Sequence, residues 1–276
     1  GTITQNQMTV KKIYLSTGDI VAVTGSGYAP DGRFYMDSQE IDPAGSPALT
    51  LALRSGVLCN GAELKRTDGG WTVIGDPTEG ALLALGLKAG IEKESLYAAF
   101  GFVGEIPFDA SRKMMTMVYR GEGGHYAFVK GAVERVLPLC TAIFDGKVSR
   151  PIEEADRERI KKTADELSSE ALRVLALAYR ESPGKLTVED SQSLEKDLTF
   201  ISIAGMLDPP REEISSAVKK ARSAGITPIM ITGDHKLTAV AIAKETGIFR
   251  DGDIAVTGEE LDTMGAEEFK EKLLRI

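Results

Sequence analysis

The sequence has 276 residues, of which 42% are hydrophobic and 27% are charged. A chain of this length predicts two domains or one large one, and its composition is typical of a globular protein rather than a disordered, collagenous or coiled-coil one. No apolar run approaches the ~20 residues that a membrane-spanning helix needs, and no leader pattern is visible, so we expect the chain as given to be soluble. The net charge of −8 argues against general nucleic-acid binding, although a few local Lys and Arg side chains suffice for a small phosphorylated ligand.

The cysteines and histidines give no sign of a metal site. Cys59 and Cys140 fit neither a metal-ligand spacing nor a disulfide framework, which favours a reducing compartment. His125 and His235 have no Ser or Cys triad and no second ligand set beside them, so we interpret both as structural or surface residues. We therefore predict no metal site formed by this chain alone.

Residues 10–75 contain short runs of alternating hydrophobicity separated by Gly, Asp and Pro. The pattern predicts strands and one helix, which Ser46 would cap. The strands are Ile20–Val23, Arg33–Met36 and Trp71–Ile74, and the helix is Pro47–Leu58.

A second helix is predicted to begin after Asp76, with Pro77 in its first position, and to end at Gly90. Glu79 stands three residues after the cap, where a capping-box partner belongs. Glu79 alone fits this capping role better than that of a hydrogen-bond acceptor for an exocyclic amine.

Residues 102–130 have the clearest antiparallel pattern, with a turn at Gly121–Gly124 between two alternating runs. Gly131 ends the second run, a short helix follows, and Glu153–Leu167 is amphipathic. Leu172–Tyr179 is a dense apolar run, which predicts a buried strand. Residues up to about 200 therefore predict an α+β domain.

After residue 200 the pattern changes to strand, helix, strand, helix, which is typical of a parallel doubly wound sheet. The predicted elements are Thr199–Met206, Arg211–Ala224, Ile226–Ile231 and Lys236–Thr246. The two prolines at Leu207–Pro210 suggest a hinge between the two regions.

Several short motifs could bind an anion. Thr232, Gly233 and Asp234 follow an apolar run and precede a helix, so they would lie at the carboxyl edge of a parallel sheet, where helix-start amides attract phosphate. Asp234 alone could equally be a helix cap. Lys130 precedes Gly131 at a strand-to-helix turn, where a lysine can reach a phosphate, although a solvated lysine is the simpler interpretation.

Two further positions could contribute to ligand binding. Phe108 lies in a turn with Arg112 and Lys113, a grouping that could stack a base and hold its phosphates, or Phe108 could be an ordinary core residue. Arg173 interrupts an apolar run, so we expect it to need a partner, either a carboxylate or a ligand phosphate.

Taken together and in order, these segments resemble the cytoplasmic head of a P-type cation-transporting ATPase of the type II, calcium-pump-like group. The resemblance covers nearly the whole chain and is carried by Gly1–Thr9, Gly75–Glu79, Phe108–Lys113, Lys130–Ala132, Leu172–Arg173, Met206–Arg211 and Met230–Asp234. It implies an α+β nucleotide-binding domain at residues 10–206, an antiparallel sheet with flanking helices. It also implies an incomplete α/β haloacid-dehalogenase-like, Rossmann-type phosphorylation domain at residues 1–9 and 207–276.

The resemblance also assigns roles. Phe108 would stack on adenine, Glu79 would hydrogen-bond at the adenine side, and Arg173 would contact the phosphates. Lys113 and the Lys130–Gly131 pair would line the pocket and meet the nucleotide. The remaining assignments are a hinge at Asp208, Pro209, Pro210 and Arg211, and a γ-phosphate-side group of Thr232, Gly233 and Asp234.

The function implied is ATP binding within a pump that forms an aspartyl phosphate and transports a cation across the cell membrane, with Ca²⁺ the favoured ion. ATP and Mg²⁺ are the implied ligands, and the pump's own membrane and actuator domains are the implied partners. The chain would be part of its cytoplasmic region, without direct membrane contact. Ala110 stands where some calcium pumps carry an arginine, which removes one phosphate contact.

The sequence contains neither the family's Asp-Lys-Thr motif before Gly1 nor its later Gly-Asp-Gly-Xaa-Asn-Asp motif, and both ends suggest a longer polypeptide. We therefore expect nucleotide binding without turnover. One alternative is a stand-alone haloacid-dehalogenase-type phosphohydrolase, which requires an Asp-Xaa-Asp nucleophile that we do not find. The other is a non-catalytic regulatory module, which would not prefer ATP over GTP.

Overall fold

The computed structural model describes residues 2–5, 7–68, 70–170, 172–188, 194–232 and 236–276. The chain forms two compact units. The larger holds Gln7–Asp165 and Arg173–Leu207, and the smaller holds Gly1–Asn6, Glu166–Leu172 and Asp208–Ile276. None of the described helices combines the length and apolarity that crossing a bilayer requires.

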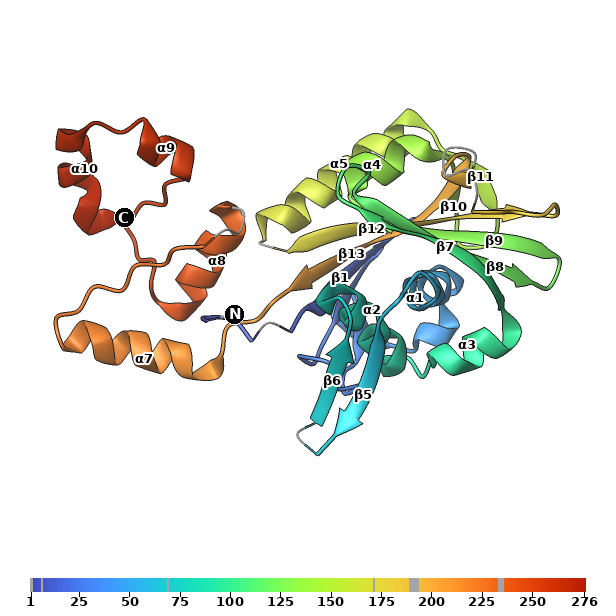
Figure 1. Cartoon of the computed structure of the whole chain (residues 1–276), viewed down its shortest axis with the longest axis horizontal. Helices are drawn as coiled ribbons and strands as arrows, with labels where there is room; N and C mark the ends of the chain where they lie inside the picture. Colours follow the sequence, from blue (N-terminus) through green and yellow to red (C-terminus); the bar gives the residue numbers. More distant parts are fainter. Residues whose placement is uncertain (1, 6, 69, 171, 189–193, 233–235) are drawn as a thin grey trace. The chain divides into compact units, whose positions relative to one another are not determined.

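The larger unit is built on one mainly antiparallel sheet (Figure 1). Its described strands are β1 (Thr9–Leu15), β2 (Ile20–Val23), β3 (Phe34–Met36), β4 (Gln39–Ile41), β7 (Gly101–Asp109), β8 (Met114–Gly121), β9 (Gly124–Gly131), β10 (Cys140–Phe144), β11 (Ser149–Pro151), β12 (Arg173–Ser182) and β13 (Leu198–Leu207). They run in the order β4-β3-β2-β1-β13-β12-β9-β8-β7, and β10 pairs with both β11 and β13. A separate hairpin consists of β5 (Glu63–Thr67) and β6 (Gly70–Ile74).

Helices α1 (Pro47–Leu58) and α2 (Pro77–Lys88) cover one face of this sheet (Figure 1). The predicted caps form: the Ser46 hydroxyl accepts a hydrogen bond from the Leu49 amide at 3.3 Å, and Pro47 and Pro77 occupy first helical turns. The side chains of Leu49, Leu53 and Leu82 are completely or almost completely buried in the core cluster beneath these helices. Helix α3 (Lys93–Ala99) follows α2 and leads into β7.

Helix α5 (Glu154–Ser169), next to the short helices α4 (Val133–Val136) and η2 (Leu137–Leu139), lies against the opposite face (Figure 1). Arg159 on α5 donates to the Tyr14 hydroxyl of β1 at 2.9 Å, and Ile160 is fully buried. Because helices lie on both faces of the sheet, its central strand β13 is buried along nearly its whole length.

The predicted succession of parallel strands after residue 200 is wrong in two respects. Thr199–Met206 falls within β13, which pairs antiparallel with β1 and β12. Ile226–Ile231 forms neither strand nor helix, and the Ile231 side chain is 93% exposed. A continuous apolar run identifies a strand only where a neighbouring strand satisfies its backbone groups, and no described strand pairs with residues 226–231.

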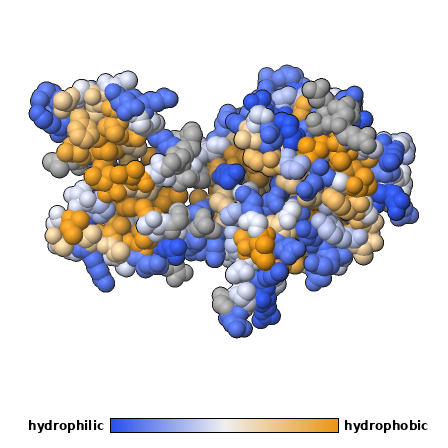
Figure 2. Space-filling view, in the orientation of Figure 1, coloured by the Kyte–Doolittle hydropathy of each residue, from blue (hydrophilic) through white to orange (hydrophobic). Residues whose placement is uncertain are grey.

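The smaller unit contains α7 (Glu212–Ser223), α8 (Lys236–Thr246), α9 (Gly258–Asp262), α10 (Ala266–Lys272) and η3 (Leu273–Arg275). A full capping box starts α9, in which the Thr257 hydroxyl and the Glu260 carboxylate each accept the other residue's backbone amide. Hydrophobic surface extends over part of this unit (Figure 2). Ile226 and Ile229 are among the exposed residues of the unit.

Residues near the start of the sequence pair with the residues that follow β13. Thr4 forms an antiparallel bridge with Pro210, the Gln5 amide donates to Pro209 O at 3.0 Å, and the Arg211 amide donates to Ile3 O at 2.9 Å. Two segments that are distant in sequence therefore lie side by side in the smaller unit.

Candidate functional site

A buried ion pair lies between the second helix and the sheet. Lys130 Nζ on β9 is 2.7 Å from Glu79 Oε1 on α2, and the two side chains are only 7% and 14% exposed. The simpler interpretation of Lys130 as a solvated lysine is therefore wrong. A buried charge must be paired and hydrogen-bonded to be tolerated, so the partners of both groups define this site.

The segment that joins α1 to the β5–β6 hairpin supplies further partners. Lys130 Nζ also donates to Cys59 O at 2.5 Å, and the Gly61 amide donates to Glu79 Oε2 at 2.9 Å. The Asn60 side chain donates to Glu79 O at 2.8 Å and accepts from the Ala62 amide at 3.0 Å. Backbone groups of this segment thus hold both members of the ion pair.

The local helix start positions Glu79. Asp76 Oδ1 accepts from the Thr78 and Glu79 amides at 2.8 and 3.3 Å, which caps α2 as predicted. The sequence favoured a capping-box role for the Glu79 carboxylate. The carboxylate does not complete a capping box, because it binds Lys130 and Gly61 instead. The position N3 of the helix points this carboxylate toward the sheet.

Cys59, whose carbonyl binds Lys130, is fully buried. Burial raises the pKa of its thiol to about 11, and the Lys130 ammonium offsets part of that rise. The thiol is therefore protonated and unreactive near neutral pH. Its backbone carbonyl, rather than its sulfur, contributes to the site.

Phe108 lies at a bulge in β7. Ile106 opposes Thr116 and Asp109 opposes Met114, so Pro107 and Phe108 together oppose the single residue Met115. Met115 in turn opposes Lys130. The Phe108 and Lys130 backbones are therefore two strand spacings apart, on the order of 10 Å. The Phe108 side chain is 61% exposed, which rules out its interpretation as a core residue.

Lys113 and Gly131 meet at the ends of β8 and β9. Lys113 has a left-handed backbone with φ of 53°, its carbonyl accepts from the Ala132 amide at 3.0 Å, and its exposed ammonium lies 3.2 Å from Glu134 Oε1. A Cβ at position 131 would lie 2.5 Å from Met114 Cβ and 2.6 Å from Lys113 O. Gly131 is required by this close strand approach, whatever else it contributes.

Arg173 is the first residue of β12 and is exposed. Burial therefore does not force it to have a partner, and its contact with a phosphate stays a prediction. It stands four residues before Leu177, which opposes Lys130. Because side chains alternate along a strand, Arg173 lies on the same face of the sheet as Leu177 and Lys130.

The remaining sequence candidates belong to the smaller unit. Asp208, Pro209, Pro210 and Arg211 form the segment that pairs with residues 3–5, as described above. Thr232 is exposed and lies outside any helix or strand. Gly233 and Asp234 lie outside the described residues.

One buried network was not predicted from the sequence. Arg112 Nη1 binds both oxygens of Glu195 at 2.5 and 2.7 Å, and the Thr116 hydroxyl donates to Glu195 Oε1 at 2.7 Å. Thr116 neighbours Met115 on β8, so this network lies on the other face of the sheet from Lys130. Arg112 therefore anchors the turn that precedes β8 from the face opposite Lys130, whereas the exposed Lys113 of the same motif pairs with Glu134.

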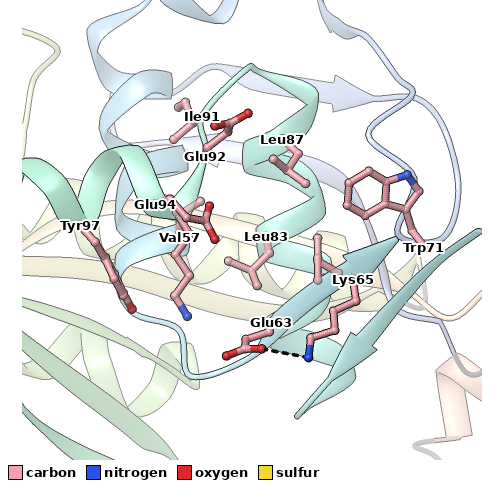
Figure 3. Close-up of a pocket in the computed structure, with 12 residues that line it drawn as sticks. Val57, Glu63, Lys65, Trp71, Leu83, Leu87, Ile91, Glu92, Glu94 and Tyr97 are labelled. Atoms are coloured by element: carbon pink, nitrogen blue, oxygen red, sulfur yellow. Dashed lines mark ion pairs between the residues drawn. The ribbon is translucent and has the colours of Figure 1, made fainter. Parts of the chain in front are cut away.

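A cavity of about 690 Å³ lies beside the site, between α1, α2, α3 and the β5–β6 hairpin (Figure 3). Apolar side chains such as Leu83 and Leu87 line its floor, Trp71 and Tyr97 stand on either side of it, and charged residues surround it. None of the site residues predicted from the sequence lines this cavity.

Comparison with known proteins gives the class of this chain. A family model described as "P-type ATPase, cytoplasmic domain N" matches residues 48–213, which is more than half of the sequence. The chain belongs to the P-type ATPase family. The match covers the two helices on the sheet, the Glu79–Lys130 pair and the Phe108 bulge.

Individual relatives are named as cation-transporting ATPases. The chain is 39% identical to the cation-transporting ATPase pma1 of Synechocystis, and 38% identical to a calcium-transporting ATPase of Bacillus subtilis. It is also 38% identical to a probable cation-transporting ATPase F of Mycobacterium tuberculosis. These alignments cover 97%, 97% and 98% of the chain, and the chain spans about 30% of the length of each relative.

Proposed function

We propose that this chain binds ATP as the N domain of a P-type cation-transporting ATPase. The whole pump would couple ATP hydrolysis, through an aspartyl phosphate, to cation transport across the cell membrane, with Ca²⁺ the favoured ion. The family match and the names of the relatives support this class of protein, a P-type cation-transporting ATPase. The observation that carries the proposal is the register of the sheet, in which the backbone of Phe108, whose side chain is exposed, lies two strands from that of the buried, paired Lys130.

The chemistry of these side chains suits a purine nucleotide. The exposed ring of Phe108 offers a face on which adenine can stack. Lys130, and beyond the strand end Lys113 and Arg173, offer cations for a polyphosphate on the same part of the sheet. Glu79 offers carboxylate oxygens that can accept from the exocyclic amine of adenine, which guanine does not present in that position.

Nucleotide binding would therefore act mainly by positioning. Phosphoryl transfer depends on holding the γ-phosphate in line with its acceptor and on neutralising its charge. In this proposal the N domain holds the base and carries the phosphates toward the phosphorylation domain. The pump's membrane and actuator domains would be the partners that use this movement.

We assign residues 10–206 to the N domain and residues 1–9 and 207–276 to part of a haloacid-dehalogenase-like phosphorylation domain. Asp208, Pro209, Pro210 and Arg211 would form the hinge between them. Thr232, Gly233 and Asp234 would lie on the γ-phosphate side. The family match extends to residue 213 and supports the first of these assignments.

Mg²⁺ would enter with ATP, as its charge-neutralising counterion. Among the described residues, no three Asp, Glu, His or Cys side chains gather into a group that could hold a metal ion. We therefore assign the described side chains no metal-dependent step. A polypeptide of these 276 residues also contains no Asp-Lys-Thr motif, so we expect it to bind ATP without sustained hydrolysis.

Isothermal titration with ATP and GTP tests the proposal. We expect saturable binding that favours ATP, and Phe108→Ala is expected to weaken it at least about fivefold, the loss that one base–aromatic stack gives. Phe102→Ala is the matched control, because Phe102 lies on the same strand and is 56% exposed. Equal binding of ATP and GTP would favour a regulatory module instead, and unchanged affinity in Phe108→Ala would reject the assigned pocket.

A further inference from the structure

We propose that Lys93 is a positioning residue for the nucleotide site, although it lies outside that site. Lys93 is the first residue of α3 and is half-buried in the wall of the cavity beside the site. Its ammonium donates to Asn60 O at 3.0 Å and to Ala62 O at 2.9 Å, and lies 5.3 Å from the centre of the Tyr97 ring. This inference rests on the proposed function.

The geometry of residues 59–62 explains how Lys93 can act at a distance. The carbonyl of Asn60 and the amide of Gly61 belong to one planar trans peptide group, so they point in opposite directions. The carbonyls of Asn60 and Ala62 are directed to Lys93 on one side. The intervening groups, Cys59 O and Gly61 N, are directed to Lys130 and Glu79 on the other. A cation that holds one row of groups therefore also fixes the other.

The bonding of Lys93 suits this role. The ammonium forms no ion pair within the described part of the chain, so its charge is balanced by two carbonyl dipoles and an aromatic face. Charge-assisted hydrogen bonds are stronger than neutral ones. Without them, the remaining hydrogen bonds between this segment and the site would come from the Asn60 and Cys59 side chains and from the ion pair itself.

The decisive variant is Lys93→Met, which removes the three donors and keeps most of the aliphatic stem. We expect it to weaken ATP binding about threefold to tenfold, as is typical of a contact that acts on a site through its neighbours. Lys93→Arg should restore most of the affinity, because it keeps a cation with several donors. Lys65→Met is the matched control, because Lys65 lines the same cavity but donates to no group of residues 59–62.

The two cysteines provide a readout that separates local positioning from general loosening. Cys59 belongs to the held segment, whereas Cys140 is equally buried at the start of β10. In Lys93→Met we expect a thiol reagent to modify Cys59 several-fold faster while Cys140 keeps its wild-type rate. Equal acceleration of both thiols would show a merely structural effect and would overturn the inference, as would an unchanged Cys59 rate or unchanged ATP affinity.

The outcomes also separate this inference from the proposed function. If the wild-type chain fails to bind ATP, the proposed function fails, and with it the nucleotide part of this inference. If the wild type binds and Lys93→Met binds equally well, only the role of Lys93 is rejected. Should Lys93→Met not fold, Lys93→Gln, which keeps a neutral donor with a shorter reach, takes its place in both measurements.

Discussion

The ammonium of Lys130 and the carboxylate of Glu79 lie 2.7 Å apart, and both side chains are almost fully removed from solvent. Each group has a second partner on residues 59–62, since Lys130 binds Cys59 O and Glu79 binds the Gly61 amide. The pair therefore joins α2, β9 and the end of α1 at a single point. Its energetic role can be measured separately from any role in ligand binding.

Removing both members of this pair should cost less stability than the two single removals added together. We expect Lys130→Met to destabilise the protein by about 3 kcal/mol, because it leaves a buried carboxylate without its counter-charge. The double variant with Glu79→Gln should lose less than the sum of the single losses, with a coupling of about 1–3 kcal/mol. Urea unfolding of the four proteins measures this cycle.

The exposed pair of Lys113 and Glu134 is the control for this cycle. Its atoms lie 3.2 Å apart, but the side chains are 52% and 63% exposed. The same cycle there should give a coupling below about 1 kcal/mol, because solvent screens the charges. Equal coupling in the two cycles would contradict the buried character of the Lys130–Glu79 pair.

Gly131→Ala should destabilise the sheet by about 1–3 kcal/mol, the usual cost of inserting a methyl group into a packed region. The new Cβ would meet Met114 Cβ and Lys113 O at 2.5 and 2.6 Å, and a backbone oxygen cannot turn aside as a side chain can. Gly45→Ala is the matched control, since a Cβ there meets nothing within 4 Å. Thermal or urea unfolding checks both, and a loss in Gly45→Ala as large as that in Gly131→Ala would refute the steric explanation.

Lys88 predicts an alkaline change in stability. Burial, and then the nearby charge of Lys11, lower its pKa to about 8 from its usual 10.5. Between about pH 8 and 10.5 the unfolded chain therefore binds more protons at this group than the folded chain, so the contribution of Lys88 to the free energy of unfolding rises with pH. Lys88→Met should abolish this contribution.

The difference between wild type and Lys88→Met, followed by urea unfolding at several pH values, isolates this group. Other groups titrate in the same range, and the raised pKa of the Cys59 thiol acts in the opposite direction, but both are common to the two proteins. The difference should change between about pH 8 and 10.5 and be constant below it. A difference that is flat across this window would show that Lys88 keeps an ordinary pKa.

Asp156 predicts a loss of stability in acid. Its hydrogen bonds with Arg150, at 2.6 and 2.9 Å, lower its pKa to about 2. Its contribution is thus complete above its unfolded pKa of about 4 and is lost as the pH falls from about 4 to about 2. Asp156→Asn should remove this part of the acid sensitivity. Glu154→Gln should leave it unchanged, because the Glu154 carboxylate, which faces Arg157, is 71% exposed.

Much of the larger unit could be predicted from local sequence. Ser46 with Pro47, and Asp76 with Pro77, mark helix starts by chemistry that acts within one turn. The β8–β9 hairpin follows from the alternation on both sides of Gly121–Gly124. These signals need no knowledge of distant residues, and the structure confirms each of them.

The errors came where distant partners decide the outcome. An apolar run such as Ile226–Ile231 is the same whether or not a neighbouring strand exists. Glu79 has the spacing of a capping-box residue, but Lys130, far along the sequence, determines where its carboxylate goes. Arg173 interrupts an apolar run, yet it is the exposed first residue of its strand.

The contacts of the site itself were predicted only in part. Lys130, Glu79 and Phe108 were singled out by motif, but backbone groups such as Cys59 O and Gly61 N carry no residue-specific signal. Lys93 could not be recognised either, because a lysine at a helix start is common and its two carbonyl partners depend on tertiary structure. Cys59–Ala62 follows a helix and has no regular structure of its own. Such a run is the signal that could have drawn attention to Lys93.

The first and last strands of the larger unit are neighbours, with Thr9 directly opposite Leu207. The polypeptide thus enters and leaves this sheet through adjacent positions, so the sheet can be moved or replaced as one unit. Joining its two ends by a short linker and opening it at an exposed turn should give a circularly permuted protein. Exchange with the matching sheet of a related protein should leave the spacing of the host chain unaltered.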